Sequence, residues 1–251
     1  MKIEYYKRYS RRLGRVMEFK VYGHAGQPWL FFPCQNGRFY DFENFKMTDV
    51  WAPVIEAGKV QIFTVDTIDG ETWSFKSGNP HQRIERHEQW FWYVTDELLP
   101  EILKINSAAN GGQNADGIMN FGCSMGAMHA ANFFLRRPDL FSGCLCLSGL
   151  YGAEDSFGAY TEPLIYDNSP VDFLKNMPLD HPYIRMYNER KMIFCVGQGA
   201  WEDELKASTR ELELIFRQKG IHAWFDYWGY DVSHDWYWWY MQVKKFLPYV
   251  T

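Results

Sequence analysis

Short apolar segments alternate along the chain with longer amphipathic ones. Eight segments are typical of β-strands, because they are short runs rich in apolar, β-branched and aromatic residues: KIEYYKRYS, RVMEFKVYG, WLFFPC, VQIFTVD, GIMNFGC, GCLCLSG, KMIFCVG and HAWFDYW. Segments with the longer period of helices lie at 41–57, 81–106, 125–137, 203–219 and 236–247. Strands that alternate with helices predict an α/β protein, with a mostly parallel sheet of about eight strands and helices on both faces.

The first two strands differ from the rest, because only the short turn SRRLG separates them. They are therefore predicted to form an antiparallel hairpin at one edge of the sheet. The chain has 251 residues, 47% of them hydrophobic, which is enough for one domain over 1–251 with a sizeable core. Residues 106–117 predict a polar, glycine-rich loop within that domain. Residues 151–177 are too long for a tight connection, so we expect a small cap-like insertion over the entrance to a site.

Charge and composition exclude several classes of protein. The formal net charge of −5 and the absence of a basic stripe argue against binding to nucleic acid. The first residues lack the apolar stretch of a signal peptide, and no later run approaches the roughly 18 apolar residues that span a bilayer. We therefore expect a cytoplasmic protein without a membrane partner. The five cysteines form no CxxC pair and are interpreted as small buried residues rather than as disulfides or metal ligands.

One short motif points to chemistry. The sequence GCSMG at 122–126 matches the pattern G-x-S-x-G, which is weak evidence alone. It stands, however, between a predicted strand and a predicted helix, and a sharp strand-to-helix turn is the setting in which this motif presents a nucleophile. The N-terminus of the helix also favours developing negative charge. Ser124 is therefore the candidate nucleophile of a nucleophile elbow.

A serine nucleophile needs a base, and the base needs an acid to orient it. In α/β hydrolases these residues follow in the order serine, acid, histidine. Three histidines follow Ser124 in the chain outside the helix that it begins. His181 precedes the next strand, and His222 opens the last strand at its amino end. Only His234 lies in the loop between the last strand and the last helix, so it is the candidate base.

The acid is expected after the strand KMIFCVG, where the sequence GQGAWEDE offers three carboxylates. Glu202 comes first after the flexible turn and is the preferred candidate. Asp203 is the alternative acid, although it stands with Glu204 in the expected first turn of a helix, where carboxylates often merely complement the helix dipole.

The reaction also needs hydrogen-bond donors for an oxyanion. One predicted donor is the backbone N–H of Met125, the residue after the nucleophile. The second is expected from the loop that follows WLFFPC, with Gln35 as the first choice and Asn36 as the next.

With these motifs the chain resembles the putative esterase family of α/β hydrolases, the group that contains esterase D, feruloyl esterases and mycolyltransferases. The resemblance covers most of the length and rests on FFPCQNGRFYDFE, NFGCSMGAMHAANFFLRRPDLFSGCLCLSGLY, YDNSPVDFL, VGQGAWEDE and YWGYDVSHDWYWW. It implies the α/β-hydrolase fold, Ser124 as nucleophile and His234 as base. The family's acid corresponds to Glu202 when it is counted from Gly199. Many members have a His-Gly pair where this chain has PCQNG, so the second oxyanion donor departs from the family pattern.

The expected activity is that of a serine carboxylic ester hydrolase, which forms an acyl-enzyme with a small acyl, aryl or sugar ester. Four aromatic residues are predicted to line the substrate cleft: Trp73, Tyr151, Trp201 and Trp236. The alternatives are an acyltransferase that uses the same triad and a non-catalytic binding protein on a hydrolase scaffold. We expect a small-molecule ester as substrate and no metal or organic cofactor. The sequence is also compatible with a homo-oligomer.

Overall fold

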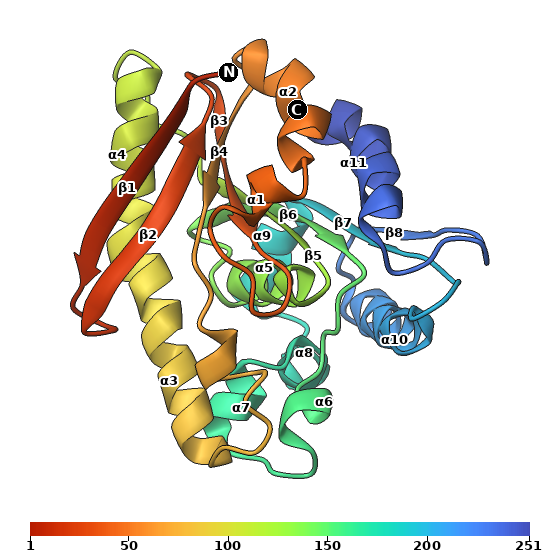
Figure 1. Ribbon diagram of the computed structural model, residues 1–251. Coiled ribbons are helices and arrows are strands. Elements are labelled where there is room, and N and C mark those ends of the chain that lie inside the picture. The colour runs from red at the N-terminus through yellow and green to blue at the C-terminus, as the bar shows by residue number, and fades with distance from the viewer.

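The computed structural model describes residues 1–251, which form one eight-stranded sheet surrounded by helices (Figure 1). The strands are β1 (Ile3–Ser10), β2 (Arg15–Tyr22), β3 (Gln27–Phe32), β4 (Val60–Thr64), β5 (Ile118–Cys123), β6 (Phe141–Leu147), β7 (Lys191–Val196) and β8 (Trp224–Tyr227). Their order in the sheet is β1-β2-β4-β3-β5-β6-β7-β8. β1 and β2 form an antiparallel hairpin, β2 is antiparallel to β4, and all later pairs are parallel. The predicted α/β architecture with its hairpin at one edge is therefore confirmed.

The helices include all five predicted helical segments. They are α1 (Asp41–Asn44), α2 (Met47–Glu56), α3 (Pro80–Trp92), α4 (Leu99–Ala109), α5 (Met125–Arg136), α6 (Glu154–Phe157), α7 (Pro163–Asp167), α8 (Pro170–Asn176), α9 (Pro182–Asn188), α10 (Asp203–Lys219) and α11 (Trp236–Val250). A 3₁₀ turn, η1 (Asp69–Glu71), precedes α3, and a π-helical segment, η2 (Tyr93–Leu98), joins α3 to α4. The predicted helix at 41–57 is divided into α1 and α2, because Lys46 has a left-handed φ of 54°. The short helices α6 to α9 were not predicted, since so few turns show no clear period.

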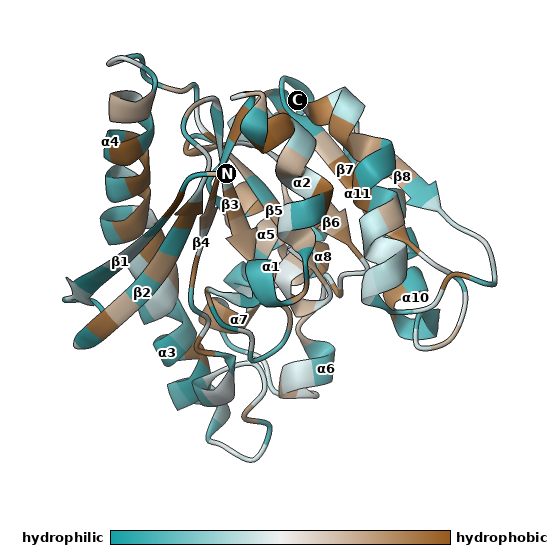
Figure 2. Ribbon diagram, turned by 45° about the horizontal axis from the view of Figure 1, so that its top comes forward, coloured by the Kyte–Doolittle hydropathy of each residue, from teal (hydrophilic) through white to brown (hydrophobic).

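Two hydrophobic cores lie on opposite faces of the sheet. Along β3, Leu30 and Phe32 point into the core that is shared with α3, α4, α5, α8, α9 and α10. Trp29 and Phe31 point into the other core, which is shared with α1, α2 and α11. Burial on both faces explains why the central strands are continuous apolar runs, and they are coloured as hydrophobic in Figure 2.

The carboxyl ends of the parallel strands meet at one edge of the sheet. The loops at this edge connect β3 to α1, β4 to α3, β5 to α5, β6 to α6, β7 to α10 and β8 to α11. In Figure 1 the helices α6 and α7 lie below this edge, beside the N-terminal end of α3, whereas both chain termini lie at the opposite end. Open α/β sheets bind their ligands outside the carboxyl ends of the strands, so a ligand site is expected at this edge. None of the helices is both long and apolar enough to cross a membrane.

Candidate active site

Ser124 occupies a strained turn between β5 and α5. Its φ of 57° and ψ of −129° lie outside the regions that residues with a side chain normally adopt, at a cost of about 1–3 kcal/mol. The two glycines of the motif permit this turn. A Cβ atom on Gly122 would lie 2.2 Å from the carbonyl of Gly126, and one on Gly126 would lie 2.2 Å from the Phe32 carbonyl oxygen. The motif therefore lets helix α5 begin directly against the ends of β3 and β5.

The structure brings His234 to the serine. The Nε2 atom of His234 lies 2.9 Å from Ser124 Oγ, although the two residues are separated by 110 positions in the chain. The backbone N–H of His234 donates to the carbonyl of Ala200 at 3.0 Å, which ties the loop after β8 to the loop after β7. This second contact holds the imidazole over the elbow.

The neighbouring carboxylate is that of Glu202. Its Oε1 atom lies 3.3 Å from Nδ1 of His234, and its side chain is only 1% exposed. Because an ionised carboxylate only accepts hydrogen bonds, this contact suits an imidazole that has its proton on Nδ1 and an unprotonated Nε2 facing Ser124 Oγ. The side chain of Asp203, in contrast, is 87% exposed and pairs with Lys206. Glu204 is also exposed, so only Glu202 of the three carboxylates contacts the imidazole.

One further residue contacts this carboxylate and a second one supports that residue, and the sequence reasoning missed both. Ser148 directly follows β6, and its hydroxyl donates to Glu202 Oε1 at 2.7 Å. The indole Nε1–H of Trp239 donates in turn to Ser148 Oγ at 3.2 Å. The sequence signal for Ser148 was its position at the carboxyl end of β6. This strand lies beside β7, and β7 leads to Glu202.

The backbone N–H groups of Met125 and Gln35, the two preferred candidates for oxyanion donors, have no hydrogen-bond partner in the protein. Met125 is the first residue of α5, so its N–H has no partner within the helix. The N–H of Gln35 donates to no group of the protein, while its side-chain amide donates to Ser74 Oγ at 2.9 Å. The N–H of Asn36, the second choice, is occupied, because it donates to Asp69 Oδ2 at 3.0 Å.

A cavity of about 140 Å³ lies beside Ser124. Its apolar wall consists of Met125, Met128, Leu150 and Leu205, and its polar wall includes Gln35, Lys76, Gly152, Asp155 and Ser156. Three of these residues, Gly152, Asp155 and Ser156, belong to the segment 151–177. The ammonium group of Lys76 lies 3.0 Å from the Asp155 carboxylate, which connects the loop before α3 to α6.

A buried arginine fixes the wall of the cavity. Arg83 is only 3% exposed, and its guanidinium donates to the carbonyls of Thr72, Trp73 and Ser156 at 2.8, 3.1 and 2.9 Å. It also lies over the ring of Phe157, 4.4 Å from the centroid. Burial lowers the pKa of Arg83. The three carbonyl contacts join the loop before α3 to helix α6.

Of the four aromatic residues predicted to line the substrate cleft, two lie in the core and two lie nearer the surface. Trp73 and Tyr151 are 1% and 0% exposed. Trp73 Nε1 donates to His87 at 3.0 Å, and the ring of Tyr151 packs edge-on against that of Phe194. These two rings fill the core, and neither lines the cavity beside Ser124, so we do not retain them as substrate contacts.

The other two aromatic residues lie nearer the surface. Trp201 is 88% exposed and directly precedes Glu202. Trp236 is partly buried and stacks on Phe45, with ring centroids 4.4 Å apart. Both residues flank the loops that carry Glu202 and His234, but neither lines the cavity itself.

The cysteines near the site are not rival nucleophiles. All five cysteines are free. Burial raises the pKa of Cys123, the residue before Ser124, and it raises the pKa of Cys34 to about 12. Thiols with raised pKa values are protonated at neutral pH and react slowly. No group of three or more His, Cys, Asp or Glu side chains is arranged to hold a metal ion.

Comparison with solved structures shows which fold this is. A ferulic acid esterase superposes with a TM-score of 0.72 at 19% identity, covering 100% of this chain and 98% of its own. An S-formylglutathione hydrolase from Agrobacterium tumefaciens gives a TM-score of 0.69 at 16% identity, with coverages of 98% and 93%. FphF, a fluorophosphonate-binding serine hydrolase of Staphylococcus aureus, gives 0.67 at 12% identity, with coverages of 99% and 97%. A search of curated protein sequences found no match.

These neighbours and the sheet topology define the chain as an α/β hydrolase in fold. The chain belongs to the family described as "Putative esterase", whose model matches residues 10–249. Membership of this family supports the hydrolysis of small-molecule esters as the general activity.

Proposed function

We propose that this protein is a serine carboxylic ester hydrolase, with Ser124 as nucleophile, His234 as base and then acid, and Glu202 as the acid of the triad. The observation that carries the proposal is the 2.9 Å contact between Ser124 Oγ and His234 Nε2. It occurs at a strained elbow beside a cavity. Glu202 supports the same assignment, because it holds the Nδ1–H of the imidazole and so leaves Nε2 as an acceptor.

The proposed reaction has two acyl transfers. In the first, the proton of Ser124 moves to His234 Nε2 while Oγ bonds to the acyl carbon, and the carbonyl electron pair moves to oxygen. The N–H groups of Met125 and Gln35 donate to this oxyanion. When the carbon–oxygen bond to the alcohol breaks, the alcohol takes the proton from Nε2. A water molecule then repeats the sequence on the acyl-enzyme and releases the acid.

The cavity favours a short acyl group. Its volume of about 140 Å³ lies below the roughly 300–1,000 Å³ of most ligand pockets. The apolar wall suits the methyl or short alkyl part of such a group. The segment 151–177 supplies part of the polar wall, and we propose that it acts as a cap that limits the length of the acyl chain. Trp201 and Trp236 flank the site and are proposed to contact an aryl or sugar alcohol.

A panel of p-nitrophenyl esters from acetate to octanoate tests this proposal, together with labelling by a fluorophosphonate probe. The acetate ester should have the highest kcat/KM, and the probe should modify Ser124. Ser124→Ala should lose kcat by a factor on the order of 10⁶ and lose labelling, while its thermal unfolding stays unchanged. A variant that kept a few per cent of the activity would disprove the assignment of Ser124.

The same experiments separate the alternatives. A binding protein on a hydrolase scaffold would not be labelled and would release no p-nitrophenol. An acyltransferase would be labelled equally, but an added sugar alcohol would then divert the acyl group from water. The ratio of free acid to new ester in the products measures that partition.

A further inference from the structure

Asp69 is a buried carboxylate that the proposed reaction does not use. It lies in η1, in the loop after β4, and is 1% exposed. Its Oδ1 atom lies 2.9 Å from Nε2 of His129, and its Oδ2 atom accepts the backbone N–H of Asn36 at 3.0 Å. Because an ionised carboxylate only accepts, Nε2 of His129 carries the proton of the first contact. Burying such a group is unfavourable unless its hydrogen bonds are made, and here each oxygen has one partner.

The two partners of Asp69 come from the two segments that hold the proposed oxyanion donors. Asn36 directly follows Gln35 in the loop after β3. His129 lies on α5, four positions after Met125 and thus about one turn into the helix. Asp69 therefore connects the segment of one N–H group to the segment of the other. The side chain of His129 is fully buried and packs edge-on against the ring of Trp90, so it has little freedom to move.

A second connection runs parallel to the first. The Gln35 side chain donates to Ser74 Oγ at 2.9 Å, and the N–H of Ser74 donates to the carbonyl of Asp69 at 2.9 Å. The loop after β4 thus contacts both Gln35 and Asn36.

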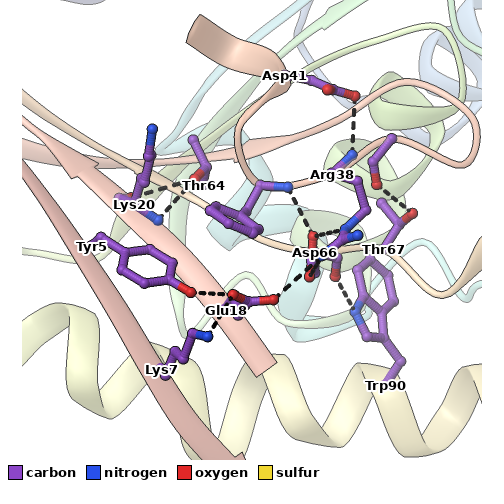
Figure 3. A network of polar contacts seen from close by, with 12 residues as sticks. Tyr5, Lys7, Glu18, Lys20, Arg38, Asp41, Thr64, Asp66, Thr67 and Trp90 are labelled. Atoms are coloured by element: carbon purple, nitrogen blue, oxygen red, sulfur yellow. Dashed lines mark hydrogen bonds and ion pairs between the residues drawn. The ribbon is translucent and has the colours of Figure 1, made fainter. Parts of the chain in front are cut away.

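The far end of the loop after β3 is anchored by other residues (Figure 3). Asp66 accepts from the Arg38 guanidinium at 2.8 and 3.2 Å, and the hydroxyl of Thr67 donates to the carbonyl of Gly37 at 2.9 Å. The other end of this loop, nearer Ser124, is held by the contact of Asn36 with Asp69. Asn36 also has a left-handed φ of 57°, a turn conformation that asparagine tolerates.

We propose that Asp69 and His129 form a positioning pair that fixes the distance between the two oxyanion donors, the N–H groups of Met125 and Gln35. This inference rests on the proposed function. The role is geometric, because a carboxylate cannot itself stabilise a negative oxygen. Donors stabilise an oxyanion only if they are held within about 0.5 Å of the required position, and these two donors lie on separate segments that Asp69 and His129 connect.

The test compares His129→Leu, which removes the contact to Asp69, with His129→Gln, which can still donate from a side-chain amide. His129→Leu should lower kcat by about 10- to 100-fold, which is less than the 10²- to 10³-fold loss seen when an oxyanion donor is removed. Its KM should change by less than about threefold, because the ester carbonyl of the ground state needs the donors little. His129→Gln should recover most of kcat. Asp69→Asn, which keeps the shape but not the charge, provides a second loss variant if His129→Leu does not fold.

A trifluoromethyl ketone gives a readout that a merely structural role would not change. It adds to Ser124 and forms an oxyanion, so its affinity should fall in parallel with kcat/KM in His129→Leu and Asp69→Asn. The matched control is His87→Gln, because His87 is a buried histidine that stacks on His129 but contacts neither Asp69 nor Asn36. This control should lower thermal stability and leave kcat per labelled active site within about twofold.

Each outcome decides the question. The inference is overturned if His129→Leu and Asp69→Asn retain wild-type kcat, or if they lose activity while the inhibitor binds as before. It is also overturned if kcat falls as far in His129→Gln as in His129→Leu and falls equally in His87→Gln. Wild-type protein without esterase activity or labelling at Ser124 would instead refute the proposed function, and the inference with it.

Discussion

The indole of Trp239 stands at right angles to the imidazole of His234, with ring centroids 4.8 Å apart and an interplanar angle of 88°. The same indole donates its N–H to Ser148, whose hydroxyl donates to Glu202. Trp239 thus contacts the proposed base through its ring and the proposed acid through one intervening hydroxyl. The other carboxylate oxygen, Oε2, has no partner, so Ser148 is the only group besides His234 that holds this side chain in place.

Trp239→Phe should therefore weaken the site without removing it. The substitution keeps an aromatic ring beside His234 but deletes the donor to Ser148, so the serine hydroxyl and the carboxylate lose part of their orientation. We expect kcat to fall by about three- to tenfold, since one neutral hydrogen bond contributes about 0.5–1.5 kcal/mol. Steady-state kinetics on p-nitrophenyl acetate measure the change. Unchanged kcat in Trp239→Phe and in Ser148→Ala would show that this chain of contacts has no role in the reaction.

Glu202→Gln should lose far more activity than Asp203→Asn. The neutral amide introduced by this substitution cannot stabilise the imidazolium and can favour the wrong tautomer of His234, and removal of this charge from a triad costs up to about 10⁴-fold in kcat. Asp203 points to solvent and pairs only with Lys206, so its variant should stay within about twofold of wild type. The reverse ranking of the two kcat values would transfer the role to Asp203.

The fold could be predicted from the sequence because the central strands of its sheet are buried on both faces. A strand such as β7, with Met192 and Phe194 on one face and Ile193 and Cys195 on the other, appears as a continuous apolar run. The short helices within 151–177 have too few turns to show a helical period in the sequence. The positions of Ser124, Glu202 and His234 followed from the order of strands, because loops at the carboxyl edge of a parallel sheet lie close together.

Other parts of the site could not be predicted, because they depend on packing between residues far apart in the chain. The contacts of Ser148 with Glu202 and of Asp69 with His129 span 54 and 60 positions. No local pattern marks such pairs. The aromatic residues illustrate the converse problem: they make up 18% of the chain, so a tryptophan near the site in sequence, such as Trp73, can equally well fill the core.

The proposed base predicts how activity depends on pH. His234 must be neutral to accept the proton of Ser124, so kcat/KM should fall toward acid pH with a single limb of slope about one. His181 caps helix α9 through the N–H of Tyr183, and His222 lies at the amino end of β8, away from the proposed site. The variants His181→Gln and His222→Gln should therefore keep both the wild-type kcat/KM and its decline toward acid pH. His234→Ala should lose most of its kcat/KM. An active His234→Ala would overturn the triad.

His87 predicts a pH dependence of stability that is separate from activity. It is fully buried and contacts Trp73 Nε1 and the side chain of Asn168, each at 3.0 Å. Burial lowers the pKa of His87 well below its ordinary value, and the electrostatic interactions of His87 with His129 and Arg136 lower it further. The folded protein therefore keeps this imidazole neutral, while the unfolded chain binds a proton below about pH 6.5.

The sign of the effect follows from this difference. Below about pH 6.5 the unfolded state binds more protons than the folded state at this position, so acid favours unfolding. One such group lowers the free energy of unfolding by up to about 1.4 kcal/mol for each pH unit of acidification. Urea unfolding between about pH 7.5 and 5.5, on either side of that value, should therefore show a flatter decline in His87→Gln than in wild type. The exposed His222 provides the control, because His222→Gln should retain the wild-type slope, and equal slopes in all three proteins would show that His87 is protonated in the folded state as readily as in the unfolded chain.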